Sequence, residues 1–231
     1  MNGKVLVNPL DRPIWHALTS THRALALGGA RARRYPPEIA PFADMADASP
    51  ESFAALGTLI APSDYVVLFT TETVSPPPAF RILFAKTLEQ MVGTPAEAPG
   101  AAADIVTLGA ADVPDMMELT KLTNPGPFAV RTHELGTFLG IRAGGQLVAM
   151  TGERMKPGHH TEITAVCVHP DHRGRGYAQA LLGAVARGIV ARGEIPFLHV
   201  FSDNDSAIAL YRRQGMEIRR RLYVTVLGKA A

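Results

Sequence analysis

The sequence predicts an α/β fold of the α+β type, with a mixed, mostly antiparallel central sheet flanked by helices. Residues 136–168 contain three β-rich runs, and turns at 144–145 and 156–158 separate them, as in hairpins. Apolar residues at helical spacing then follow Gly176. A strand, a helix and two more strands complete the chain, and this order is typical of mixed α/β domains.

The elements of the second half can be assigned from residue patterns. We expect strands at 104–108, 136–142, 146–155, 162–168, 196–201, 216–219 and 222–226, and helices at 111–122, 176–193 and 204–214. In the helix after Gly176, one face carries Ala178, Leu181, Leu182, Val185 and Ile189. Gly193 is its expected end.

The first half gives weaker patterns and forms a smaller α/β unit. A helix is expected from about 14 to 27, another begins at Ser49-Pro50-Glu51, and Tyr65 to Thr71 is β-rich. Residues 81–92 fit either a helix or a strand. Small residues and two prolines at 94–103 predict a linker. The chain would then divide into an accessory half at 1–93 and a second half at 104–231.

Composition limits the functions to consider. The 231 residues carry a net charge of +2, and the one dense basic cluster, between Arg212 and Arg221, is expected to be solvated, so no nucleic-acid partner is expected. The alternative for that cluster is a small anionic ligand. The single cysteine excludes an intrachain disulfide and fits a reducing compartment. The longest apolar run, Tyr65 to Phe69, is far shorter than the ~20 residues of a membrane span. We expect no membrane partner and a cytoplasmic location.

The most informative segment is the loop HPDHRGRGYAQ, between the strand ending at Val168 and the next helix. Gly174 and Gly176 allow a sharp turn without a steric penalty from a Cβ atom. Such a turn leaves N–H groups unpaired at a helix N-terminus, and they favour an anion, phosphate above all. Arg173 and Arg175 add charges that match phosphate geometry.

Two common phosphate loops are excluded. A P-loop needs Gly-Lys-Ser/Thr, which is missing, and a dinucleotide-binding fingerprint needs a small residue where Gln179 stands. Arg173 to Ala178 instead matches Arg/Gln-x-x-Gly-x-Gly/Ala, and it resembles the coenzyme A pyrophosphate loop of the GNAT superfamily of N-acetyltransferases. A second motif, Asn204 to Met216, resembles that superfamily's Asn-x-x-Ala-x-x-Leu-Tyr-x-x-x-Gly-Phe, with Met216 in place of the aromatic residue.

The resemblance covers roughly 104–228 and is closest to the two-part branch that includes glycine N-acyltransferase-like proteins. It implies a GNAT-like acyl-CoA N-acyltransferase fold, acetyl-CoA as cosubstrate and 104–231 as the catalytic half. It also implies that the strand at 166–168 splays from its neighbour to pair with the pantetheine arm. The implied coenzyme A-binding residues are Val166, Cys167, Val168, Arg173, Gly174, Arg175, Gly176, Tyr177, Ala178, Gln179, Asn204 and Ala207. Asn204 is also expected to cap its helix.

The resemblance further implies direct attack of a primary amine on the thioester. Tyr211 is the candidate acid for the leaving thiolate, because a phenol stays protonated at neutral pH. An N–H group near Val166 is the expected oxyanion donor. Glu162 is the first candidate base and Glu153 the second. Strand alternation predicts that Glu162 shares a face with Thr164, Val166 and Val168.

Several alternatives follow from the same residues. The same alternation turns Cys167 away with Ile163 and Ala165, so a buried structural thiol is expected, not a covalent nucleophile. The histidine pairs at 159–160 and at 169 and 172 do not belong to a set of four ligands with the spacing of a tetrahedral metal site, so no metal is expected. The acceptor is the amine of a small molecule, an amino acid or a peptide, walled in part by residues 123–132. A non-catalytic sensor or scaffold that binds coenzyme A is the alternative function. The accessory half could be a lid, a dimer face or a degenerate GNAT-like copy, and a homodimer stays open.

Overall fold

A computed structural model describes residues 8–95 and 104–230, so the predicted linker lies almost entirely outside it. Its α-helices are α1 (Pro13–Thr19), α2 (Pro50–Thr58), α3 (Val113–Thr123), α4 (Tyr177–Ala191) and α5 (Asp205–Arg213). Its strands are β1 (Leu27–Gly28), β2 (Ala32–Arg34), β3 (Ala43–Met45), β4 (Tyr65–Thr70), β5 (Phe80–Val92), β6 (Ile105–Leu108), β7 (Phe138–Ala143), β8 (Gln146–Glu153), β9 (His160–Val168), β10 (Ile195–Phe201) and β11 (Glu217–Lys229). No helix among these residues is both long and apolar enough to span a bilayer.

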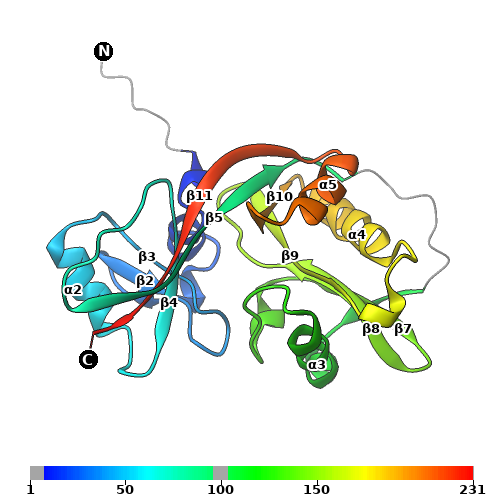
Figure 1. Cartoon of the computed structure of the whole chain (residues 1–231), viewed down its shortest axis with the longest axis horizontal. Coiled ribbons are helices and arrows are strands. Elements are labelled where there is room, and N and C mark those ends of the chain that lie inside the picture. The colour runs from blue at the N-terminus through cyan, green and yellow to red at the C-terminus, as the bar shows by residue number, and fades with distance from the viewer. Residues whose placement is uncertain (1–7, 96–103, 231) are drawn as a thin grey trace, which may run out of the picture.

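One large sheet runs through the molecule (Figure 1). Its eight strands lie in the order β4-β11-β5-β10-β9-β8-β7-β6, and β1, β2 and β3 form a separate small sheet. Within the large sheet only β9 and β10 are parallel, and the other neighbours are antiparallel. The predicted fold class, a mixed and mostly antiparallel sheet flanked by helices, is confirmed.

The two longest strands cross from one half of the molecule to the other. β5, from the first half of the sequence, lies between β10 and β11, while β11, from the end of the sequence, lies between β5 and β4. The prediction of two strands at 216–219 and 222–226 is wrong, because β11 is continuous. Three consecutive arginines interrupt its apolar pattern, and a bulge between Ile218 and Arg220 accommodates the extra residue.

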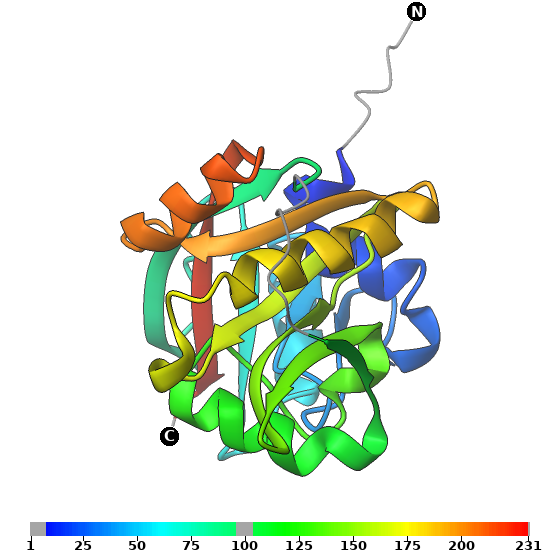
Figure 2. The same ribbon diagram turned by 90° about the vertical axis from the view of Figure 1, so that its right-hand side faces the viewer.

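Helices cover both faces of the second half of this sheet. Leu182, Val185 and Ile189 of α4 pack with Tyr211 of α5 in one core, and Met116 and Leu119 of α3 pack with β7 to β9 in another. Figure 2 shows α4 and α5 on one side of these strands and α3 on the other. A third core joins the two halves, since α1, β4, β5, β10 and β11 all contribute to it.

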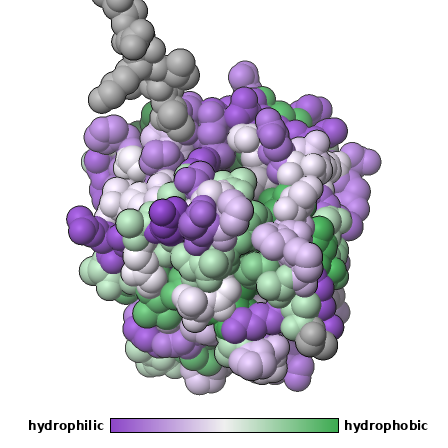
Figure 3. Space-filling model, turned by 90° about the vertical axis from the view of Figure 1, so that its left-hand side faces the viewer, coloured by the Kyte–Doolittle hydropathy of each residue, from purple (hydrophilic) through white to green (hydrophobic). Residues whose placement is uncertain are grey.

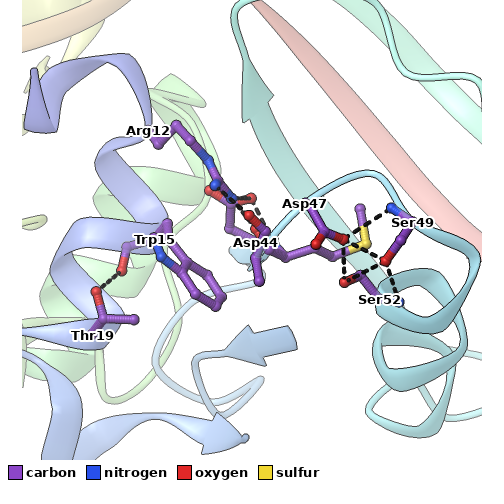
Figure 4. Close-up of polar contacts among 9 residues, drawn as sticks. Arg12, Trp15, Thr19, Asp44, Asp47, Ser49 and Ser52 are labelled. Atoms are coloured by element: carbon purple, nitrogen blue, oxygen red, sulfur yellow. Dashed lines mark hydrogen bonds and ion pairs between the residues drawn. The ribbon is translucent and has the colours of Figure 1, made fainter. Parts of the chain in front are cut away.

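The first helix is shorter than predicted. α1 ends at Thr19, whereas the apolar spacing suggested a helix to about residue 27. Thr19 Oγ1 donates to the carbonyl oxygen of Trp15 at 2.7 Å (Figure 4), and the hydroxyl of Ser20 donates to that of His16. Hydroxyl groups that bond back to the helix in this way compete with its continuation.

The second helix begins where the sequence predicted. Ser49 caps α2 by accepting from the Ser52 N–H group at 3.3 Å, and Pro50 is the first helical residue. Beside this cap, the Arg12 guanidinium donates to Asp44 at 2.8 Å and ties α1 to β3 (Figure 4).

On the left-hand face of the molecule, which this half occupies, apolar side chains gather in the middle and along the right-hand rim (Figure 3).

Candidate functional site

A bulge in β9 decides which of its side chains face which side. Ala165 has a left-handed φ of 52°, and the pairing with β8 shifts there, since Cys167 pairs with Met150 but Thr164 pairs with Gly152. Ile163 and Val166 consequently pack on the side of α4 and α5, while Ala165 and Cys167 pack with α3. The predicted alternation is therefore right from Ala165 to Val168 but wrong before the bulge, where Ile163 lies on the side of Val166. It would hold throughout only in a strand without a bulge.

Glu162 lies on the other face of the sheet from Val166, because its neighbour Ile163 shares the side of Val166. It is fully buried, and its two oxygens accept from Arg154 at 2.7 and 2.8 Å. His199 Nδ1 lies 2.7 Å from Oε1. Burial would raise the pKa of Glu162, but the charge and hydrogen bonds of Arg154, with the His199 hydrogen bond, lower it to about 2.

β9 and β10 separate beyond their first residues. Their parallel ladder runs from Ile195↔His160 to Phe197↔Glu162, and no further pair joins them. The expected splay of the strand at 166–168 is therefore present. Among the residues that the structure describes, no strand pairs with the end of β9 on the β10 side.

The loop after β9 has the conformation that its glycines predict. A short 3₁₀ turn (Pro170–His172) follows the strand, and Gly174 and Gly176 then adopt left-handed φ angles of 74° and 77°. Gly176 is the N-cap of α4, and no side chain caps this helix. Its first N–H groups therefore point outward without an intrahelical partner.

These features surround a single cavity of about 550 Å³. Its lining residues come from β9, the glycine loop, α4, α5 and the end of α3: Thr123, Val166, Cys167, Val168, His172, Arg173, Gly174, Arg175, Gly176, Tyr177, Ala178, Gln179, Asn204, Ser206, Ala207, Leu210 and Tyr211. Every residue predicted to bind coenzyme A is among them, and so is Tyr211. Glu162 and Glu153 are not.

α5 brings the second motif to this cavity. Asn204 Oδ1 accepts from the Ala207 N–H group at 3.1 Å, so the predicted cap is confirmed. Burial raises the pKa of the Tyr211 phenol to about 12. Burial likewise raises the pKa of Cys167 to about 11, which fits an inert thiol.

The second candidate base and the arginine cluster are used elsewhere. Glu153 is buried and pairs with Lys156 at 2.9 Å and with Arg192 at 2.8 Å. Arg219 and Arg220 pair with Asp11, and Arg221 pairs with Glu89. None of these residues lines the cavity. In the described part of the chain, no three potential metal ligands cluster together.

Three lining residues, His172, Ser206 and Leu210, had not been predicted from the sequence. Helical spacing could have found two of them, because Ser206 and Leu210 lie one turn apart beside Ala207 and Tyr211. His172 precedes the glycine loop directly. Thr123 ends α3 and had been expected to wall the acceptor.

Comparisons with known proteins agree with this geometry. Residues 138–224 match the family described as FR47-like protein. The chain is 34% identical over 135 residues to the N-alpha-acetyltransferase RimI of Mycobacterium tuberculosis, an alignment that covers 51% of this chain and 84% of the relative. A crystal structure of a putative GNAT-family acetyltransferase from Novosphingobium aromaticivorans is 39% identical, with a TM-score of 0.88, over 97% of this chain and all of that one.

A more distant structure shows the same fold. The GCN5-related N-acetyltransferase of Kribbella flavida is 15% identical with a TM-score of 0.62, over 95% of this chain and 96% of its own. The finer resemblance to glycine N-acyltransferase-like proteins stays a prediction. With the two motifs on one cavity and relatives of this similarity, the chain belongs to the GNAT superfamily of N-acetyltransferases.

Proposed function

We propose that the chain transfers an acetyl group from acetyl-CoA to a primary amine, by direct attack within a ternary complex. The observation that supports this most is the meeting of two distant motifs on one cavity, beside the uncapped start of α4. The N–H groups there and the guanidinium groups of Arg173 and Arg175 suit a pyrophosphate. The thioester supplies the activated acyl carbon, and the chain's own groups position it.

The oxyanion donor that we propose is the Val166 N–H group. The bulge sets two residues, Ala165 and Val166, opposite Thr151, and β10 has already separated from β9. The register shift leaves Val166 without a paired residue on β8 or β10, and we therefore assign its N–H group to a ligand in the cavity. Such donors contribute roughly 3–4 kcal/mol to transition-state stabilisation.

Tyr211 is our candidate for the acid. As the N–C bond forms and the C–S bond breaks, the sulfur takes the proton of the Tyr211 hydroxyl. With a pKa of about 12 this phenol is protonated at every working pH, although burial also makes it a weaker acid.

The acceptor's proton is assigned to water in this proposal, because none of the described residues that line the cavity is a carboxylate. Without a strong base, the acceptor must already be partly neutral. At pH 7 roughly a tenth of an α-amino group is neutral, but only about one in 2,500 of a lysine side chain. This favours an α-amine, and the relative named as an N-alpha-acetyltransferase supports the same choice.

A thiol-release assay tests the proposal. The chain is mixed with acetyl-CoA and a panel of amino acid amides, peptides and alkylamines, and coenzyme A binding is measured by calorimetry. We expect turnover with α-amines, and a loss of ~10²–10⁴-fold in kcat for Tyr211→Phe with binding retained. Tyr65→Phe, which removes the hydroxyl of an exposed tyrosine on β4, outside the lining of the cavity, is the matched control and should change kcat little. Binding without any turnover would favour the non-catalytic sensor or scaffold.

A further inference from the structure

Half of β5 has an open edge. β10 pairs with β5 only from Phe201↔Leu88 to Phe197↔Val92, and the segment from Arg81 to Lys86 has no strand partner on that side among the described residues, although the Lys86 ammonium pairs with Asp203 at 2.8 Å. All six residues of this segment are exposed. An exposed strand edge presents a row of N–H and C=O groups to which another chain can pair.

The edge is apolar and adjoins the cavity. Ile82, Leu83 and Phe84 are 48%, 47% and 39% exposed, and Phe201 at the end of β10 is 41% exposed. The rings of Phe84 and Phe201 meet edge to face at 6.1 Å. Three residues beyond Phe201, Asn204 lines the cavity, so the edge and the donor site are continuous.

The direction of the free backbone groups follows from the residues that are already paired. The Thr87 carbonyl oxygen accepts from the Ser202 N–H group at 3.1 Å, and the Gly93 N–H group donates to Pro196 at 3.2 Å. Both lie on the β10 side of β5. Because backbone groups alternate along a strand, Ala85 also turns its N–H and C=O groups toward the open edge.

The direction of an added strand decides which of its ends reaches the cavity. A segment pairing antiparallel to β5 continues the line of β10, which is itself antiparallel to β5. Its N-terminus then lies beside Phe201, next to the cavity, and its chain runs toward Arg81. A parallel segment would present its carboxylate there instead.

We propose that the acceptor is the N-terminus of an extended polypeptide that pairs antiparallel with the β5 edge from Lys86 to Arg81. The span is about 17 Å, enough for five or six residues. Main-chain hydrogen bonds hold the segment. Because a bulge at Leu83 turns Ile82 and Phe84 to opposite faces of the sheet, each contacts the side chains on its own face of the segment. This inference rests on the proposed acetyl transfer and adds its substrate class.

The test compares randomised hexapeptide amides with randomised dipeptide amides. Both have a free α-amine, but only the hexapeptides are long enough to lie along the edge. Thiol release from acetyl-CoA should give the hexapeptides a kcat/KM at least tenfold higher. Ala85→Pro removes one outward N–H group at an edge position that tolerates proline, and should abolish this advantage. Ala85→Ser keeps the N–H group and should retain it.

Three controls make the outcome decisive. Thermal stabilisation by coenzyme A, equal in both variants, shows that Ala85→Pro is folded and that its donor site is intact. Equal rates for hexapeptides and dipeptides, or equal behaviour of the two variants, would overturn the inference while leaving acetyl transfer standing. If no amine is acetylated at all, binding of fluorescent hexapeptides still decides, since Ala85→Pro must weaken it tenfold. If Ala85→Pro changes the molecular mass of the protein in solution but does not change the acetylation or binding of peptides, the edge binds a second copy of the chain. That result would overturn the inference.

Discussion

The two faces of β9 carry opposite kinds of polar environment. On one face Glu162 is buried, and both of its oxygens are held by Arg154 and His199. On the other face Val166 lines a cavity where the N–H groups at the start of α4 have no capping side chain. The polar groups of the first face are paired within the protein, whereas the N–H groups of the second are available to a ligand. The bulge at Ala165 separates the two.

The buried face also joins the two halves of the molecule. Gln90 of β5 donates from its amide nitrogen to the Leu10 carbonyl and lies 3.0 Å from His199 Nε2, while its oxygen accepts from Arg219. The amide orientation is therefore fixed, and His199 accepts through Nε2 and donates through Nδ1 to Glu162. These polar groups form a structural network, so we expect their loss to affect stability rather than ligand binding.

The largest predicted effect breaks the buried face. Arg154→Ala leaves the Glu162 charge without its main partner, and should lower the free energy of unfolding by about 3–5 kcal/mol. Arg175→Ala, an exposed arginine on the cavity face, is the matched control and should change it by less than about 0.5 kcal/mol. Urea denaturation measures both. Equal losses would mean that the two faces do not differ as described.

Acid should weaken the buried face in a defined range of pH. The pKa of Glu162 is about 2 in the folded state against an ordinary 4.5, so its carboxylate stabilises the fold above about pH 4.5. That contribution, about 3 kcal/mol, is lost as the pH falls from 4.5 to 2. Glu162→Gln should already be less stable at pH 7, and its unfolding free energy should fall less steeply with acid. Parallel pH profiles for the two proteins would contradict this.

A smaller effect is expected at the bulge. Ala165 holds a left-handed φ, which costs an L-residue about 1–2 kcal/mol and is worse for a β-branched one. Ala165→Val should therefore destabilise the fold by about 2 kcal/mol and weaken coenzyme A binding, because Val166 would be displaced. Ala165→Gly should bind normally. Calorimetry on both variants checks this, and normal binding by the valine variant would show that the bulge is not needed.

The smallest effect lies far from β9. Ser49→Ala removes the cap of α2 and should cost about 1 kcal/mol. Because β5 and β11 extend through both halves, the loss of this cap should lower the unfolding midpoint of the whole chain. Fluorescence of the single tryptophan, Trp15 in α1, should report the same midpoint as far-ultraviolet circular dichroism. Two separate midpoints would mean that the halves unfold independently.

Much of the second half could be predicted from sequence because its signals are local. The hairpin turn at Gly144-Gly145, the glycines at 174 and 176, and the apolar face of α4 each specify backbone within a few residues. The resemblance of this loop and of the Asn204 motif to the GNAT superfamily implied most of the residues that line the cavity. The position of β5 could not be predicted this way, because its neighbours β10 and β11 lie more than a hundred residues further along the chain.

Glu162 shows where residue patterns fail at the site. Its assignment assumed unbroken alternation along β9, and alanine gives no local signal for a left-handed bulge. Its partner Arg154 is eight residues away across a hairpin, and His199 lies on another strand. No spacing in the sequence distinguishes such a buried ion pair from a catalytic carboxylate.

The crossing of β5 and β11 has a consequence for how the chain is made. The first half has its own strand β4, yet the neighbour of that strand is formed by residues 217–229. During synthesis β4 and β5 must wait, with apolar side chains uncovered, until residues 217–229 have left the ribosome. Pairing over such a sequence distance is slow and exposes a nascent chain to aggregation. A variant that lacks β11 should therefore leave both halves unable to fold.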